Sequence, residues 1–334
     1  MDISDARWYQ ISDESQINET RRQIIALAHS EGVDEKCCDR ISVVCQELTS
    51  NLIKHTEAGG SLIAQIVNRE ESTGLDLYCI DAGLGMDIDE CMVDGFSSKG
   101  TLGTGLGAIK RMSDKFSIAS SLQNGTVIHV RFWNSPPKPK SPFSWGGMSV
   151  PKKGELLSGD KWNIQLQEKE AYCLIVDGLG HGLDASEASA LAVKRFKENL
   201  DMPPSAMVKL LHKSLRGSRG AVGAVAKIDI KAKKLLFCGL GNIEGIIHDG
   251  EITKHLVSLN GTLGYEARKF NEYELPWSAN TKLVMHTDGF TSKTCRNVPE
   301  LSSLTAGCLA GALYKNNARD TDDATIVILS GSKS

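Results

Sequence analysis

The chain has 334 residues, which is long enough for two domains that each bury a core of their own. A hydrophobic content of 41% and a charged content of 24% are typical of a folded globular protein, and no apolar run is long enough to cross a bilayer. The net charge of −3 gives no electrostatic argument for binding nucleic acid or an anionic membrane, so we expect neither as a partner.

Before residue 134 the chain alternates between helical spacing of apolar residues and the alternation typical of strands. The predicted elements are helices at 19–30, 35–56 and 107–114 and strands at 61–68, 75–80 and 126–133. This order favours an α+β sandwich, with helices on one face of a mixed sheet.

A boundary follows at residues 135–147. The run from Asn134 to Pro142 holds four of the nine prolines of the chain, and neither a helix nor a central strand accommodates them. We therefore expect a stiff linker between a first domain at 1–134 and a second domain at 148–334.

After the linker strands dominate, and two long helices interrupt them. The predicted strands are 172–176, 221–228, 235–239, 245–247, 282–286 and 325–329, and the helices are 183–200 and 204–215. Many strands with two helices favour an αββα sandwich of stacked sheets flanked by helices.

The nine cysteines include no C-x-x-C pair, and several lie within apolar patterns, where a thiol behaves as a small hydrophobe. The adjacent Cys37 and Cys38 could form a redox pair, but at a helix start they favour an inert role. The first residues lack the basic region of a secretory signal, so we expect a protein of the reducing cytoplasm.

Glu47, Asn51 and His55 are spaced by four and therefore share one face of the second predicted helix. An amide oxygen can bind Mg²⁺, and a carboxylate one turn away can accept a proton from an attacking hydroxyl. Alone, such a stripe is more typical of the solvated face of an amphipathic helix.

Two glycine-rich segments follow. The first, Asp81-Ala-Gly83-Leu-Gly85, ends a strand with a carboxylate that can accept a hydrogen bond from an adenine amino group, although an isolated D-x-G-x-G is more often a plain turn. The second, Ser97 to Gly107, precedes a helix, where free N–H groups and the helix dipole favour phosphate. It matches neither the dinucleotide-binding fingerprint nor a P-loop.

In this order the three segments resemble the GHKL (Bergerat) ATPases, and most closely the serine/threonine kinases of bacterial partner-switching systems, the anti-sigma-factor and switch kinases. The resemblance covers the first half of the chain and implies Glu47 as catalytic base, Asn51 as Mg²⁺ ligand and Asp81 as adenine contact. It implies further ATP contacts at Gly83, Gly85, Lys99, Gly103, Thr104, Gly105, Leu106 and Gly107. His55 is expected to pack or to support the residues that contact the ligand, rather than to accept a phosphoryl group.

The second half places four aspartates where strands meet turns. They are Asp160, Asp177, Asp288 and Asp322. Carboxylates that converge in this way need a cation to stay ionised, and all-oxygen ligation selects Mg²⁺ or Mn²⁺ rather than zinc. A single Asp-Gly pair is an ordinary turn, as we expect for Asp249-Gly250.

The ordered set Ser-Gly-Asp160, Val-Asp177-Gly-Leu-Gly-His-Gly, His-Thr-Asp288-Gly-Phe and Asp322-Asp-Ala-Thr resembles the PP2C-like metal-dependent phosphatases of the SpoIIE type. The resemblance implies two Mn²⁺ or Mg²⁺ ions. Their ligands would be Asp160, Asp177, Gly178 (through its backbone), Asp288 and Asp322, with Asp177 and Asp288 as catalytic groups. The chain departs from this family at one place: relatives often carry a glutamate shortly after T-D-G, where this chain has Ser292 and Lys293. His181 is expected to help bind the substrate or only to shape its turn.

The resemblances together predict a bifunctional regulator. The first half would use Mg-ATP to phosphorylate a serine or threonine on a STAS-domain protein, and the second half would remove such a phosphate. The alternative is a first half that only senses ATP and gates the phosphatase, or that binds an anti-sigma pathway component. A homodimer is compatible with either prediction.

Overall fold

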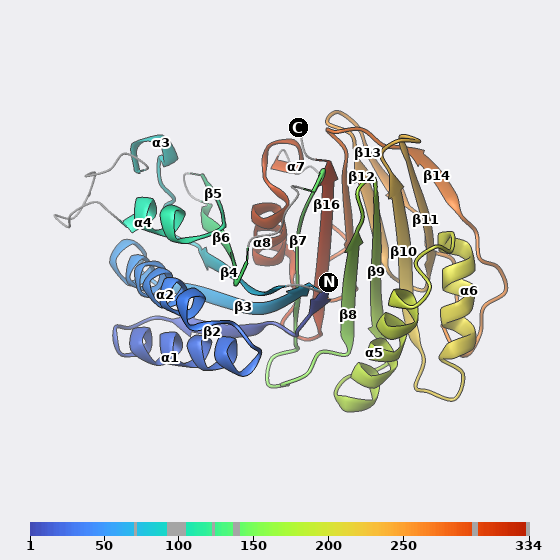
Figure 1. Ribbon diagram of the computed structural model, residues 1–334, viewed down its shortest axis with the longest axis horizontal. Coiled ribbons are helices and arrows are strands. Elements are labelled where there is room, and N and C mark those ends of the chain that lie inside the picture. Colours follow the sequence, from blue (N-terminus) through green and yellow to red (C-terminus); the bar gives the residue numbers. More distant parts are fainter. Residues whose placement is uncertain (70–71, 92–104, 122–123, 136–140, 296–299, 332–334) are drawn as a thin grey trace. The chain divides into compact units, whose positions relative to one another are not determined.

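A computed structural model describes the chain except for residues 70–71, 92–104, 122–123, 136–140, 296–299 and 332–334 (Figure 1). The chain divides into two compact units. One comprises Ala6–Lys138, and the other combines Met1–Asp5 with Pro139–Ser334. Within the described ranges, no helix has the length and apolar character needed to cross a membrane.

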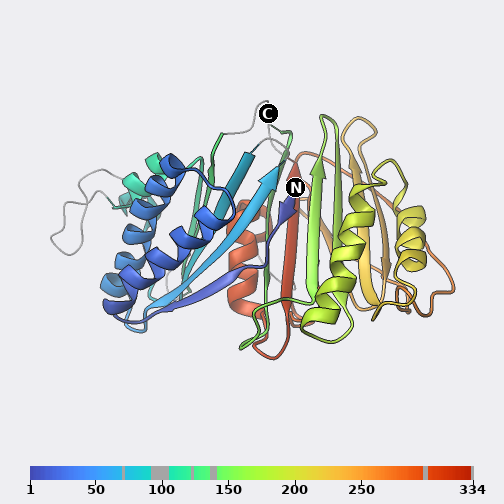
Figure 2. The same cartoon turned by 60° about the horizontal axis from the view of Figure 1, so that its bottom comes forward.

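The Ala6–Lys138 unit packs two long helices on one face of an antiparallel sheet (Figures 1 and 2). Its helices are α1 (Ser15–Ser30), α2 (Glu35–His55), α3 (Ile88–Cys91) and α4 (Gly105–Met112), and its strands are β2 (Arg7–Ile11), β3 (Gly60–Arg69), β4 (Ser72–Asp81), β5 (Lys115–Ser121) and β6 (Gly125–Trp133). The strand order is β3-β4-β6-β5, and β2 also pairs with β3. The predicted α+β class is confirmed.

Sequence signals explain why α2 forms and which face it buries. The Asp34 carboxylate caps the helix by accepting a hydrogen bond from the Cys37 backbone at 2.8 Å. Ile41, Leu48 and Leu52 recur at helical spacing and are fully or almost fully buried against the sheet. The opposite stripe of α2 is thereby left to carry polar groups.

The sheet face that points away from α2 holds a buried charge network. The guanidinium of Arg131 on β6 donates two hydrogen bonds, of 2.5 and 2.6 Å, to the carboxylate of Asp76 on β4. His129 lies 3.5 Å from the same carboxylate and stacks on Tyr78, and its side chain is fully buried. Although burial opposes ionisation, the charges of Arg131 and His129 and their hydrogen bonds hold the pKa of Asp76 well below its ordinary value.

Acidification below pH 6.5 is expected to destabilise the protein through His129. Burial lowers the pKa of this imidazole from 6.5 to about 4, although the Asp76 carboxylate opposes the shift. Between these two pKa values the unfolded chain binds a proton at His129 and the folded chain does not. The free energy of unfolding therefore decreases as the pH is lowered, by about 2 kcal/mol between pH 7 and pH 5. Denaturant unfolding at pH 7, 6 and 5 measures this loss.

The matched variants are His129→Gln and His29→Gln, since His29 is exposed at the end of α1. His129→Gln should flatten the pH profile over this range, and His29→Gln should leave it unchanged. Identical profiles for the wild type and His129→Gln would contradict the assignment.

The second unit stacks two five-stranded sheets. One sheet has the order β14-β11-β10-β9-β8 and the other β13-β12-β15-β16-β7. The strands of these two sheets are β7 (Phe143–Val150), β8 (Asp160–Leu166), β9 (Glu170–Gly178), β10 (Ala221–Asp229), β11 (Lys234–Leu240), β12 (Glu244–His248), β13 (Thr253–Leu256), β14 (Tyr273–Pro276), β15 (Lys282–His286) and β16 (Ala324–Gly331). The short strand β1 (Asp2–Ile3) also belongs to this unit but to neither of these sheets.

Helices cover both outer faces of this pair of sheets. They are α5 (Leu183–Lys197), α6 (Pro204–Ser214), α7 (Glu300–Ser303) and α8 (Ala306–Asn317). The helices α5 and α6 pack on β8 to β11, and α8 packs on β7 and β16 (Figures 1 and 2). The core under α5 and α6 includes Leu174, Phe196 and Leu211. This is the predicted αββα sandwich.

The structure differs from the predicted boundaries at two places. Strand β7 begins at Phe143, within the range 135–147 that the prolines had marked as linker, and pairs with β16 from Phe143 to Val150. Its two adjacent glycines lower its local propensity for strand, so the sequence pattern does not predict it. Pairing with β16 stabilises the strand in the folded protein. Met1–Asp5, assigned by order to the first domain, belongs with the second unit.

All nine cysteines are free thiols, and eight of them are buried. Burial raises the pKa of Cys37 to about 11 and that of Cys45 to about 12, so both stay protonated near neutral pH. An inert role for Cys37 and Cys38 is consistent with this burial.

Candidate ATP and metal sites

Glu47 and Asn51 lie on α2 where α4 begins. A Cβ atom added to Gly105, the first residue of α4, would lie 3.1 Å from the Glu47 carboxylate and 3.8 Å from both polar atoms of the Asn51 amide. The backbone of Gly105 therefore runs directly past both side chains. A carboxylate, an amide and the N–H groups of a helix start meet there, which suits a phosphate carried with Mg²⁺.

Asp81 closes β4 and organises the turn after it. Its Oδ1 accepts hydrogen bonds from the Gly83 backbone at 2.8 Å and from the Thr126 backbone at 3.2 Å. Gly85 has a φ of +75°, and a side chain there would collide with the Ser121 carbonyl. These two hydrogen bonds connect Asp81, the last residue of β4, to the turn that follows it and to the start of β6.

Three of the predicted ATP contacts, Lys99, Gly103 and Thr104, lie outside the described residues. Leu106 and Gly107 belong to α4, and the side chain of Leu106 is buried in the core. The imidazole of His55 is exposed at the end of α2.

In the second unit, β8 and β9 bring two of the predicted metal ligands face to face. Asp160 and Asp177 are directly paired across the two antiparallel strands. Burial and the neighbouring Asp177 raise the pKa of Asp160 well above its ordinary value. Burial, with the charges of Asp288 and Asp322, raises the pKa of Asp177 to about 7.

Neighbouring side chains orient these carboxylates. The Thr287 hydroxyl donates to Asp160 Oδ2 at 2.7 Å, and the Asn242 amide donates to Asp288 Oδ2 at 2.7 Å. Asp322 is exposed, and its Oδ1 accepts from the Asp323 backbone at 2.9 Å. All four predicted aspartates therefore lie in one neighbourhood, at the strand ends of both sheets.

Asp323 performs a different task from its neighbour. It is almost completely buried, and its two carboxylate oxygens accept from the Lys152 and Gly159 backbones, each at 2.7 Å. Asp323 thereby fastens the loop that leads to Asp160.

Gly178 is required by the approach of α5. A Cβ atom there would lie 2.2 Å from the Ala185 carbonyl oxygen, so no other residue fits. Its N–H donates to the Gly159 carbonyl at 3.1 Å, which ties the turn after Asp177 to the loop before Asp160.

The donor set fits a divalent cation. Buried and adjacent carboxylates repel one another, and a cation removes this cost, with oxygen donors that suit Mg²⁺ or Mn²⁺. Among the described residues, however, no three histidine, cysteine or carboxylate side chains converge tightly enough to enclose an ion. The carboxylates lie near one another but do not surround a single point closely enough to bind an ion without adjustment of their side chains.

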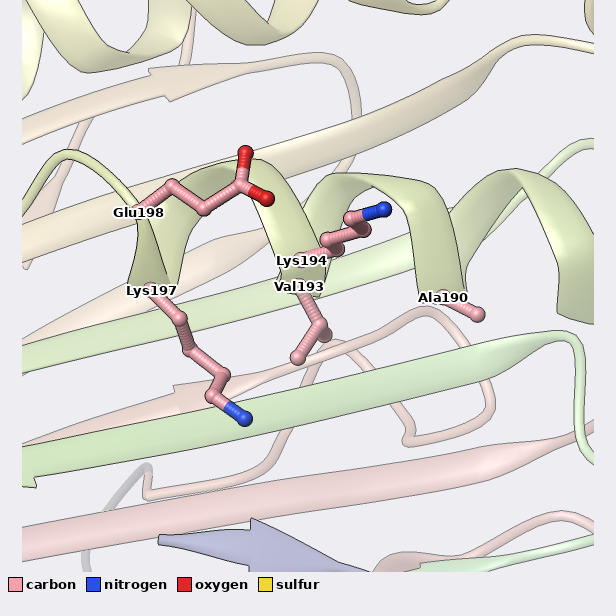
Figure 3. A pocket seen from close by; sticks show the side chains of 5 residues that line it. All are labelled: Ala190, Val193, Lys194, Lys197 and Glu198. Atoms are coloured by element: carbon pink, nitrogen blue, oxygen red, sulfur yellow. The ribbon is translucent and has the colours of Figure 1, made fainter.

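His181 lies on the turn between Asp177 and α5. It is exposed, and its Nδ1 lies 3.3 Å from a Glu155 carboxylate oxygen on the loop before Asp160. The hollow drawn in Figure 3 lies elsewhere, along one side of α5, and none of the predicted site residues lines it. Its lining is Ala190, Val193, Lys194, Lys197 and Glu198.

Sequence reasoning missed the side chains that hold the aspartates. Thr287 stands within the His-Thr-Asp-Gly motif, so its position beside Asp288 carried a signal. Asn242 and Asp323 act through hydrogen bonds between segments that are distant in sequence, so no local sequence pattern predicts these contacts.

Comparisons with known proteins divide the chain in the same way. Residues 11–132 match the histidine kinase-like ATPase domain, and residues 167–330 match the family of stage II sporulation protein E (SpoIIE). The chain is similar to the serine/threonine-protein kinase RsbT of Bacillus subtilis, with 38% identity over 95 residues, or 28% of this chain and 71% of RsbT.

The second half is similar to the phosphoserine phosphatase RsbX of Bacillus subtilis, with 28% identity over 155 residues, or 46% of this chain and 74% of RsbX. A crystal structure of RsbX in complex with magnesium matches with a TM-score of 0.51 at 22% identity, over 58% of this chain and 98% of that chain. This match supports the fold.

Proposed function

The chain belongs to the RsbT-like serine/threonine kinases through its histidine kinase-like ATPase domain, which is joined to a SpoIIE-type serine/threonine phosphatase domain, and we propose that both domains act on partner-switching proteins. The first domain would phosphorylate a serine or threonine of a STAS-domain protein, and the second would hydrolyse that phosphate. The observation that carries this proposal is the presence of two opposed phosphate chemistries in one chain.

In the kinase half, Glu47 would accept the proton of the attacking hydroxyl while Asn51 holds Mg²⁺ beside the phosphates. Gly105 runs past both side chains, which supports a phosphate position at the start of α4. Asp81 would accept a hydrogen bond from the adenine amino group, and Lys99, Gly103 and Thr104 would complete the phosphate contacts.

In the phosphatase half, Asp160, Asp177, Asp288, Asp322 and the Gly178 carbonyl would hold two Mg²⁺ or Mn²⁺ ions. When bound, these ions supply an activated water and neutralise charge on the phosphate. Thr287 and Asn242 would keep the carboxylates oriented through their hydrogen bonds.

Joining the two activities raises the effective concentration of each site near the product of the other. If they share one substrate they must be regulated in opposite directions, since otherwise they only consume ATP. We place the protein in the cytoplasm, because nine free cysteines suit a reducing compartment.

The test is phosphate transfer from labelled ATP to purified STAS-domain proteins encoded in the same genome, with Mg²⁺ present and with the Asp177→Asn variant as the enzyme, so that the second domain does not remove the label. Label on a serine or threonine of one such protein would support the kinase assignment. Binding of ATP without transfer to any of them would instead favour a first domain that senses nucleotide and gates the phosphatase.

A further inference from the structure

The first five residues, here called the N-terminal arm, belong to the phosphatase unit although they precede the kinase domain in sequence. The Asn163 amide on β8 donates to the Met1 carbonyl oxygen, and the Lys197 ammonium on α5 lies 2.7 Å from both carboxylate oxygens of Asp2. Lys197 is labelled in Figure 3. The arm thus runs beside β8, which is an edge strand of its sheet.

The arm ends at the loop that carries the first predicted metal ligand. Asp5 Oδ2 accepts a hydrogen bond from the Ser158 backbone at 3.3 Å, and Asp5 Oδ1 pairs with the Lys161 ammonium at 2.5 Å. The Lys161 ammonium also donates to the Ser158 carbonyl at 3.4 Å. Asp5 therefore holds Ser158 at its N–H directly and at its carbonyl through Lys161.

Three consecutive backbone N–H groups of this loop are each bound by a side-chain oxygen. The Ser158 N–H donates to Asp5, the Gly159 N–H donates to Asp323 at 2.7 Å, and the Asp160 N–H donates to the Ser158 hydroxyl at 3.1 Å. Ser158 is completely buried, so its N–H needs an acceptor supplied by the protein. The backbone of the Ser158–Asp160 loop is therefore held by two carboxylates, Asp5 near the start of the sequence and Asp323 near its end.

We propose that Asp5 is a positioning residue of the phosphatase, which orients the Ser158–Asp160 loop for metal binding. This proposal rests on the assignment of Asp160 as a metal ligand made above. Groups that orient metal ligands typically change metal affinity by about 10- to 100-fold when they are removed. Ala6 alone separates Asp5 from β2, so Asp5 stands where the chain passes from the arm to the first strand of the kinase domain.

The experiment uses the full-length protein and three variants. Asp5→Ala removes both contacts, and Asp5→Asn keeps an acceptor for the Ser158 N–H but loses the charge that pairs with Lys161. Asp2→Ala is the control, since it breaks an exposed ion pair of the same arm and does not touch the loop. Calorimetric titration with Mn²⁺ measures binding, and p-nitrophenyl phosphate hydrolysis at rising Mn²⁺ measures activity.

We expect Asp5→Ala to weaken Mn²⁺ binding by about 10- to 100-fold, with Asp5→Asn intermediate and Asp2→Ala unchanged. Saturating Mn²⁺ should restore kcat in the Asp5 variants, which a purely structural defect would not allow. Equal Mn²⁺ affinity in the wild type and Asp5→Ala would overturn the proposal, as would a loss of kcat that no concentration of Mn²⁺ restores. A wild type that binds no Mn²⁺ would instead overturn the metal-site assignment, and this proposal with it.

Discussion

Replacing Asp177 with asparagine is expected to abolish phosphatase activity while making the metal-free protein more stable. Asp177 faces Asp160 across the paired strands, and the charges of Asp288 and Asp322 act on it as well. Losing metal activation removes several kcal/mol of transition-state stabilisation, so the rate should fall by about three orders of magnitude. Hydrolysis of p-nitrophenyl phosphate with Mn²⁺ measures this.

The effect on stability has the opposite sign. Because the folded pKa of Asp177 is raised to about 7 from an ordinary 3.8, its contribution to stability is full below pH 3.8 and is lost as pH rises towards 7. Asparagine does not ionise, so Asp177→Asn avoids the loss of stability that ionisation of Asp177 causes near pH 7 and above. Thermal unfolding in EDTA at pH 8 should therefore show a higher Tm for Asp177→Asn than for the wild type.

Asp249→Asn is the matched control, because Asp249 also precedes a glycine but lies in an exposed turn, where it accepts hydrogen bonds from Glu251 and Ile252. It should retain full activity. A fully active Asp177→Asn, or one with a lower Tm in EDTA, would contradict the predicted carboxylate site.

Replacing Glu47 with alanine is expected to reduce phosphate transfer by about 10²- to 10⁴-fold, the usual contribution of a general base. ATP binding should persist, because Asn51, Asp81 and the backbone at Gly105 are left in place. Transfer from labelled ATP measures the first effect, and calorimetric titration with Mg-ATP measures the second.

Glu35→Ala is a control on the same helix, since Glu35 is exposed in the first turn of α2. It should transfer phosphate at the wild-type rate. A Glu47→Ala protein that still phosphorylates its substrate at full rate would remove Glu47 from the reaction. One that binds ATP but no longer regulates the phosphatase would favour a role for Glu47 in gating.

The parts of the fold that sequence predicts well are those with strong local periodicity. The spacing of four between Glu47 and Asn51 places both on one face of α2, and in the structure both lie beside Gly105. Strands such as β4, β9 and β16 were predicted because their apolar runs are continuous and end at turns. Local pattern suffices in these cases because burial and backbone geometry agree.

The parts that escape prediction depend on contacts between distant segments. Strand β7 lies in a range marked by prolines and glycines and is recognised only through its pairing with β16. The hydrogen bonds that hold the metal loop come from Asp5, Asp323 and Thr287, which stand more than 120 residues away from it. No window along the sequence contains both partners of such a bond.

The most direct test of the central claim follows label from ATP through one STAS-domain protein in the wild type, Asp177→Asn and the double variant Glu47→Ala with Asp177→Asn. If both domains act on the same protein, phosphoprotein accumulates with Asp177→Asn, stays low in the wild type while inorganic phosphate is released, and is absent from the double variant. Equal, stable labelling by the wild type and Asp177→Asn would contradict the claim, because the phosphatase would then ignore the product of the kinase.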